Sequence, residues 1–253
     1  MLASEEIAKI FELGKGSNSI ELKLSVPSSG HSATIKSLKL DPVEAQPRQA
    51  FFFDTPKLEL LEAGVVVRAR RFQGGRADTV VKLRPVDPAM MDAELRRSAS
   101  FKIEVDVMPG GFVCSASFKG ACTGREVLDV TSGTEPLSPL FSKEQRAFLA
   151  AHAPAGINLD SLAVLGPTFL LRSKYQPKDF DHMVTVEMWL YPDGSRILEI
   201  STKSLPEAAF QVAAEFRNYL AKCGIPVSAA QETKTRSALE FFRKRLASEP
   251  AAV

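Results

Sequence analysis

The sequence predicts an α+β protein in which a closed β-barrel with a charged lumen is flanked by α-helices. Seven segments alternate between aliphatic residues and polar or charged residues, as strands with two unlike faces do. Several other segments have the apolar spacing of amphipathic helices, which must bury their apolar side against another element. Outward-facing aliphatic strand faces would supply that surface. The charged faces would then point toward one another, and closure of the barrel would leave no exposed strand edge.

The stretch Phe51–Arg84 is the most informative part of the chain. It reads as strand, turn, short helix, glycine stop, strand, glycine-rich turn and strand. Asp54 or Thr55 can cap the helix, and Gly64 suits its end. Each of the last two strands carries two basic residues on one face: Arg68 and Arg70, then Lys82 and Arg84. On one strand alone, such a face is as often solvated as it is the lining of a cavity.

Recurrence of this pattern with both signs of charge favours a lined cavity. The remaining segments of this kind are Ser19–Val26, Phe101–Val107, Thr168–Tyr175, Val184–Tyr191 and Arg196–Lys203. Together the charged faces carry the bases Lys23, Arg68, Arg70, Lys82, Arg84, Arg172, Lys174 and Lys203, and the acids Glu21, Glu104, Asp106, Glu187 and Glu199. Buried charges must be paired or bound to a ligand. A mixed set with excess positive charge suits a polyanion held by the bases and divalent cations held by the carboxylates.

The segments that connect the predicted strands are expected to form loops, turns and helices. Residues 41–49 contain two prolines and are expected to form a loop, and residues 108–136 to form turns around one or two short strands. Residues 31–40 fit a strand or a helix. Residues 85–100 are either a solvated excursion or a basic flap. Ser142 with Gln145, and Ser228 with Gln231, form capping boxes for two helices, and the second helix would carry Lys234 and Arg236.

Composition limits the classes of protein that fit. The chain has 253 residues, of which 45% are hydrophobic, and a net charge of +2 from 32 basic and 30 acidic residues. This balance gives no indication of nucleic-acid binding. Three cysteines without a CxxC motif indicate a reducing compartment. The N-terminal residues lack a signal-peptide apolar region, and no apolar run approaches the roughly 18 residues of a membrane span. We therefore expect a cytoplasmic protein with no membrane partner.

The chain resembles the CYTH superfamily, the triphosphate tunnel metalloenzymes, whose first strand has the form ExExK; here that window is Ser19–Lys23. The family's block FFDTP…L…AG…RxR stands here as Phe52–Pro56, Leu60, Ala63-Gly64 and Arg68–Arg70. Val81-Lys82-Leu83, Glu104, Asp106, Arg172, Glu187, Glu199 and Lys234 follow in the family's order. The resemblance spans about residues 19–245, which indicates a single domain over residues 1–253 with excursions at about 85–100 and 136–160.

The resemblance implies an eight-stranded antiparallel tunnel that binds a triphosphate group with Mg²⁺ or Mn²⁺. Members hydrolyse inorganic triphosphate, thiamine triphosphate or nucleoside triphosphates, and some cyclise ATP. Carried over to this chain, the substrate-binding residues would be Lys23, Arg68, Arg70, Lys82, Arg84, Arg172, Lys174, Lys203, Lys234 and Arg236. The metal ligands would be Glu21, Glu104, Asp106, Glu187 and Glu199. Lys23, Lys82 and Lys234 would assist catalysis by neutralising charge beside a phosphoryl group in transfer. A monomer or homodimer is expected.

Two positions depart from the family pattern. Ser19 stands at the first Glu of ExExK, and Ser201 at the second Glu of a late ExE strand. A neutral hydroxyl is a much weaker ligand for a hard dication than a carboxylate. The leading hypothesis is a metal-dependent triphosphate hydrolase. The alternatives are a non-catalytic phosphate- or nucleotide-binding module, an adenylate-cyclase-type enzyme, an unrelated soluble barrel, or a polyanion-binding domain that acts on nucleic acid or polyphosphate.

Overall fold

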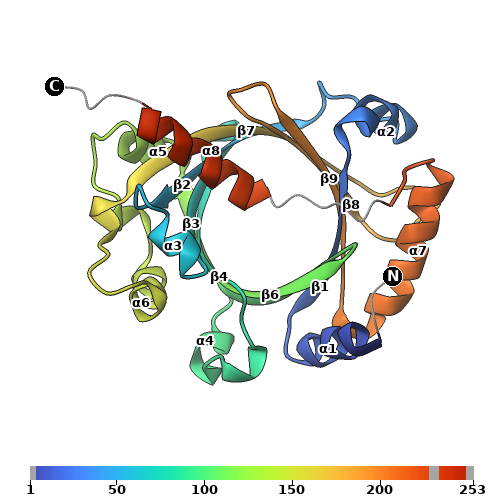
Figure 1. The fold of residues 1–253 in the computed structure, drawn as a ribbon, viewed down its shortest axis with the longest axis horizontal. Coiled ribbons are helices and arrows are strands. Elements are labelled where there is room, and N and C mark those ends of the chain that lie inside the picture. Colours follow the sequence, from blue (N-terminus) through green and yellow to red (C-terminus); the bar gives the residue numbers. More distant parts are fainter. Residues whose placement is uncertain (1–3, 228–233, 249–253) are drawn as a thin grey trace.

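Nine strands close into one barrel in the computed structural model, which describes residues 4–227 and 234–248. Around the barrel the strand order is β1-β5-β6-β4-β3-β2-β7-β8-β9, and β9 pairs with β1 to complete the ring (Figure 1). The strands are β1 (Ser19–Val26), β2 (Gln46–Asp54), β3 (Val65–Phe72), β4 (Arg76–Leu83), β5 (Phe101–Met108), β6 (Gly111–Thr123), β7 (Ala163–Tyr175), β8 (Val184–Leu190) and β9 (Arg196–Ser204).

The barrel confirms the predicted fold class, with two corrections to its details. It has nine strands where eight were expected, and β1 pairs with β5 in parallel while the other neighbours are antiparallel. The two corrections have one cause. Strand directions cannot alternate all the way around a closed ring that has an odd number of members, so one neighbouring pair must be parallel.

Eight α-helices lie around the barrel in the described part of the chain. They are α1 (Ser4–Lys15), α2 (His31–Ser37), α3 (Glu59–Glu62), α4 (Ala93–Arg97), α5 (Gly124–Thr131), α6 (Lys143–His152), α7 (Ala209–Lys222) and α8 (Lys234–Ser248). In Figure 1, α1 and α7 lie on one side of the ring, α3, α5 and α6 on the other, and α8 crosses its opening. None of these helices is long and apolar enough to cross a lipid bilayer.

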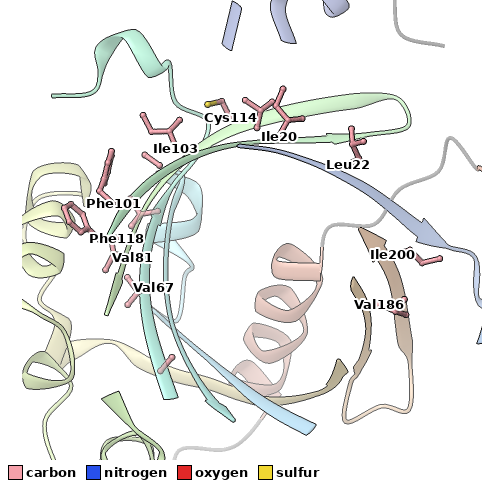
Figure 2. Packing of buried hydrophobic residues seen from close by; sticks show 14 of the residues in the cluster. Ile20, Leu22, Val67, Val81, Phe101, Ile103, Cys114, Phe118, Val186 and Ile200 are labelled. Atoms are coloured by element: carbon pink, nitrogen blue, oxygen red, sulfur yellow. The ribbon is translucent and has the colours of Figure 1, made fainter. Parts of the chain in front are cut away.

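The main core lies between the outer face of the barrel and the surrounding helices. Aliphatic side chains such as Val67, Val81 and Ile103 point outward and are each 1% exposed (Figure 2). Phe101 and Phe118 meet Phe148 of α6, with ring centroids 5.0 to 5.8 Å apart among the three. Each fully buried side chain of this size contributes about 1.5–3 kcal/mol of transfer free energy. This packing keeps the charged strand faces turned inward.

A second apolar cluster fills one end of the barrel interior. Phe52 and Trp189 lie on inward-facing strand positions there and pack with Leu239 and Phe242 of α8. Phe52 is completely buried, and Leu239 is 2% exposed. Helix α8 therefore closes this end of the lumen with its apolar stripe, and its first residue, Lys234, is placed at the edge of the charged region.

Several local predictions hold, and others need correction. Leu58 occupies the N-cap position of α3, but both predicted side chains bond to its first turn. Asp54 accepts hydrogen bonds from the amides of Leu60 and Leu61, and Thr55 accepts one from the amide of Glu59. The capping box of Ser142 and Gln145 begins α6 as predicted. The predicted loop at residues 41–49 is wrong in part, since β2 begins at Gln46. Residues 108–136 hold the thirteen-residue strand β6 and helix α5 rather than short strands. The predicted cap at Ser228 and Gln231 lies outside the described residues.

Candidate functional site

The barrel encloses a charged cavity of about 540 Å³. Its charged lining comes from all nine strands or their immediate ends and from the start of α8. The bases are Lys23, Arg48, Arg68, Arg70, Lys82, Arg84, Lys102, Lys119, Arg172, Lys203 and Lys234, and the acids are Glu21, Asp78, Glu104, Asp106, Glu187 and Glu199. Eleven bases against six acids leave an excess of five positive charges. Such a lumen attracts anions.

All but two of the site residues predicted from the sequence line this cavity. Lys174 is exposed and does not line it, because it lies next to the end of β7 at Tyr175, where the side chain reaches solvent. Arg236 is exposed on α8, pairs with Glu240 at 3.4 Å one helical turn away, and lines a neighbouring pocket instead. These two residues therefore lie outside the predicted tunnel lining.

Four charged residues of the lumen were missed by the sequence reading. Arg48 lies in the segment expected to be a loop. Lys119 lies in the long strand β6, in a segment expected to form turns around one or two short strands. Lys102 and Asp78 lie on strands that were recognised, and each continues an alternation already noted. Asp78 is two steps of period two before Lys82, so the strand period alone could have found it.

Arg70 and Asp78 form a bidentate ion pair in the lumen. They are directly opposite in the β3–β4 register. Arg70 donates Nε and Nη2 to the two carboxylate oxygens at 2.9 and 2.7 Å, and Lys119 lies 3.0 Å from the same carboxylate. A bidentate arginine–carboxylate pair is both strong and directional. Burial alone would raise the pKa of Asp78, but Arg70, Arg68 and Lys119 outweigh that effect and lower it.

A second ionic network lies where β1 pairs with β5 and β9. Lys23 Nζ is 3.1 Å from Asp106 and 3.3 Å from Glu21, and Lys203 contacts both Glu21 and Glu104. Burial opposes the charge on Lys23, but the nearby carboxylates, Glu21 first, outweigh it and raise the pKa of this lysine well above its usual value. Burial would likewise raise the pKa of Asp106, but Lys23 and Lys82 hold it well below its ordinary range.

Lys234 joins two carboxylates that face each other across a strand pair. Glu187 and Glu199 are opposite one another in the β8–β9 register. Lys234 Nζ lies 2.5 Å from Glu187 and 2.7 Å from Glu199, and Arg172 lies 3.4 Å from Glu187. Burial would raise the pKa of Glu187, but Lys234 outweighs it and holds the carboxyl ionised. Without this ammonium group two buried like charges would repel each other.

In the described residues, five lumen cations are weakly paired or unpaired, namely Arg48, Arg68, Lys82, Arg84 and the exposed Lys102. Arg68 and Arg84 form no ion pair with any carboxylate in the described residues, and Arg68 Nε is buried without a hydrogen-bond partner there. Lys82 has only Asp106, at 3.7 Å. Burial lowers the pKa of Arg68 to about 9 and of Lys82 to about 8. Asp106 opposes the shift at Lys82, while Lys23 and Arg84 add to it. Buried cations without partners are poised to bind an anion.

The carboxylates have the right chemistry for a hard dication but are occupied by lysines. Carboxylate oxygens are preferred ligands of Mg²⁺ and Mn²⁺. Within residues 4–227 and 234–248, however, no group of three potential ligands is arranged to hold a metal ion. Ser19 donates a hydrogen bond to Glu104 at 3.3 Å, and the buried Ser201 lies opposite Lys23 in the β1–β9 register. These carboxylates could therefore bind a metal ion only if a lysine that now pairs with them moved away.

Known proteins match this chain in their structure but not in their sequence. No family model matches the chain, and no curated protein matches it by sequence. Among solved structures, the fold matches that of a candidate adenylyl cyclase from Hippeastrum described as having a dominant triphosphatase activity. This match has a TM-score of 0.65 and 17% identity, and covers 88% of this chain and 96% of that one.

A candidate adenylate cyclase from Bacillus halodurans matches in the same way. Its TM-score is 0.61 with 14% identity, and the match covers 87% of this chain and 97% of that one. At these identities the likeness concerns the fold. The chain shares the fold of these two structures, which agrees with the resemblance seen in the DTP-to-RxR block and in the order of the charged strands.

Proposed function

We propose that the protein is a metal-dependent hydrolase of a triphosphate-containing substrate, which binds in the lumen of the barrel. Inorganic triphosphate, thiamine triphosphate and nucleoside triphosphates are the candidate substrates. The observation that carries this proposal is the presence of Arg68 and Arg84 in a closed lumen without a carboxylate partner in the described residues. Leaving such charges unpaired is costly, and an incoming phosphate group would satisfy them.

The lumen residues would divide the work of binding and catalysis. Arg68, Lys82 and Arg84 can bind phosphate oxygens without breaking a strong ion pair. Lys23, Lys203 and Lys234 lie within ion-pair distance of the carboxylates, where they can neutralise charge that develops on a transferring phosphoryl group. Arg70 is already fixed by Asp78, so it would orient the substrate with little loss of its own freedom.

The proposed metal ligands are Glu21, Glu104, Asp106, Glu187 and Glu199. A bound Mg²⁺ or Mn²⁺ would supply charge neutralisation at the phosphate chain and a polarised water. The lysines that now pair with these carboxylates can move to phosphate oxygens when the substrate enters. The chain's own residues would thus exchange partners, so that phosphates hold the lysines while the carboxylates become available.

Phosphate release tests the proposal. Inorganic triphosphate, ATP and thiamine triphosphate are each incubated with the protein, with and without Mg²⁺ or Mn²⁺, and thermal unfolding is followed in parallel. Metal-dependent release from any of the three supports a hydrolase and identifies its substrate. If no substrate releases phosphate and none raises the unfolding temperature, the tunnel does not bind triphosphate and the proposal is wrong.

A non-catalytic phosphate-binding module is the second candidate. Ser19 and Ser201 stand where the resemblance implies acids, and the described residues hold no ready group of three metal ligands. Thermal stabilisation by triphosphate without turnover would identify this case. An adenylate-cyclase-type activity is the third candidate, because the two similar structures are described as candidate cyclases. Release of pyrophosphate with cyclic AMP from ATP would identify it.

A further inference from the structure

A second cavity, of about 480 Å³, adjoins the charged lumen near α8. We call it the side pocket. Its wall is formed by Leu61 and Gly64 at the α3–β3 turn, by Arg84 and Pro85 after β4, by the β5–β6 hairpin from Met108 to Val113, and by Arg236 of α8. None of the residues that the family resemblance assigns to catalysis or metal binding lines it.

The side pocket borders the lumen. Val66, Arg84 and Met108 line both cavities. Arg84 is the residue at this boundary that bears charge, and it has no carboxylate partner in the described part of the chain. A phosphate group bound by Arg84 would therefore be the phosphate nearest to the side pocket. Whatever is esterified to that phosphate would extend out of the lumen and into this second space.

The lining of the side pocket differs sharply from that of the lumen. Apolar side chains predominate: Leu61, Val66, Pro85, Met108, Pro109, Phe112 and Val113. The two charged residues recorded there are both arginines, and the described lining contains no acid, whereas the lumen contains six. Small-molecule sites are commonly apolar clefts with a few directing polar groups. A positively charged ligand group would meet two guanidinium groups and no carboxylate of the described lining, because Glu240, the acid paired with Arg236, lies outside it.

We propose that the side pocket binds the organic group of a triphosphate ester and selects an uncharged ring over a cationic one. The proposal rests on the proposed function, because it requires the phosphate chain to occupy the lumen. On this basis the preferred substrate class is a nucleoside triphosphate, whose base is uncharged at neutral pH. Thiamine triphosphate carries a cationic ring and is disfavoured by Arg84 and Arg236. Inorganic triphosphate leaves the side pocket empty.

Gly111 offers a way to fill this pocket without touching the lumen. It lines the side pocket and lies outside the positive-φ region, and a Cβ built on it meets no atom within 4 Å. A larger side chain is therefore compatible with the backbone and would occupy space that the proposed ring needs. Val43 is 87% exposed and lines none of the cavities described here, so Val43→Trp is the matched control for adding an indole.

Calorimetric titration with metal chelated tests the proposal without turnover. The expected result is that ATP binds the wild type at least about tenfold tighter than thiamine triphosphate. Gly111→Trp should weaken ATP binding by about tenfold or more and leave inorganic triphosphate within about twofold of wild type. Val43→Trp should change neither. Val113→Phe, from the same pocket wall, replaces Gly111→Trp if that variant does not fold by circular dichroism.

A charge-reversal variant gives a second, independent test of the side-pocket proposal. Arg236→Glu places an acid in the side pocket and should raise the affinity for thiamine triphosphate while lowering that for ATP. Equal losses of ATP and inorganic triphosphate binding in Gly111→Trp, or no loss of either, would overturn the side-pocket proposal and leave the triphosphate tunnel standing. Failure of the wild type to bind inorganic triphosphate and both esters would overturn the proposed function together with this inference.

Discussion

Lys234 lies between Glu187 and Glu199, with its Nζ 2.5 Å from one carboxylate and 2.7 Å from the other. The two glutamates are opposite each other on β8 and β9, and all three side chains are at most 15% exposed. The ammonium group thus lies between two of the carboxylates that would hold a metal ion under the proposed function. Because Lys234 is the first residue of α8, it also ties the helix that closes the barrel end to the charged lumen.

Lys234→Met should destabilise the protein and create a metal-sensitive site. The change leaves two facing carboxylates without their shared cation, which costs about 3 kcal/mol or more in the free energy of unfolding. Mn²⁺ should recover part of this loss, since a ligand that binds only the folded state stabilises it. Urea unfolding, with and without Mn²⁺, measures both effects.

Lys119→Met is the control for that experiment. Lys119 pairs with Asp78 at 3.0 Å, but its side chain is 59% exposed, so the loss should stay below about 1 kcal/mol and should not respond to Mn²⁺. If Lys234→Met were as stable as wild type and insensitive to Mn²⁺, the bridging role assigned to Lys234 would be refuted.

Arg68→Ala and Lys82→Ala should each weaken triphosphate binding. Both side chains line the lumen and are poorly paired, so they are available to phosphate oxygens, and each charge-assisted contact contributes about 1–3 kcal/mol. Isothermal titration with inorganic triphosphate gives the affinities. Lys174→Ala is the control. Lys174 shares a face of β7 with Arg172 but does not line the lumen, so this variant should bind triphosphate as the wild type does. If both lumen variants bound triphosphate with wild-type affinity, the lumen would not be the triphosphate-binding site.

The affinity for triphosphate should fall as the pH rises through about 8. Burial lowers the pKa of Lys82 to about 8, below the roughly 10.4 of an unfolded lysine. The folded protein therefore holds fewer protons than the unfolded chain between these values, so this group makes stability rise with pH in that window. Phosphate binds the ammonium form, so binding is strongest below about pH 8 and weakens above it.

Lys82→Arg separates this effect from titration of the ligand itself. An arginine starts from a higher pKa than a lysine, so its affinity should fall less than that of the wild type just above about pH 8. The measurement is calorimetry with inorganic triphosphate at several pH values between about 6.5 and 9.5. Parallel pH profiles for the two proteins would show that Lys82 does not titrate in the site.

Strand periodicity was enough to predict which charged faces line the lumen. Glu21, Lys23, Glu104 and Asp106 reach the cavity because alternate positions of a strand share a face, and burying the aliphatic positions against helices fixes which face that is. The same reasoning could not place Arg48, because Pro42 and Pro47 made its segment look like a loop. Pro47 is the second residue of β2, where a proline is tolerated near a strand end.

The pairing of the charges depends on distances that the sequence does not contain. Lys203 meets Glu104, ninety-nine positions away, because β9 and β5 are both neighbours of β1. The parallel β1–β5 pair, which the resemblance did not imply, brings Glu21 opposite Asp106. Lys174 shows that the face of a strand does not decide burial by itself. Its strand face was predicted correctly, but β7 ends at Tyr175 and the side chain of Lys174 lies in solvent.

Ser19→Glu combined with Ser201→Glu should raise the affinity for Mn²⁺. Ser19 lies beside Glu104, and Ser201 shares the lumen face of β9 with Glu199, so each new carboxylate would join an existing acidic group. Carboxylates bind hard dications far better than hydroxyls do. The neutral pair Ser19→Gln and Ser201→Gln has nearly the same bulk and should give no gain. Titration with Mn²⁺ followed by electron paramagnetic resonance measures the free ion directly. If both double variants bind Mn²⁺ equally, the two serines do not stand at a metal site, and the family's acidic pattern does not carry over to this chain.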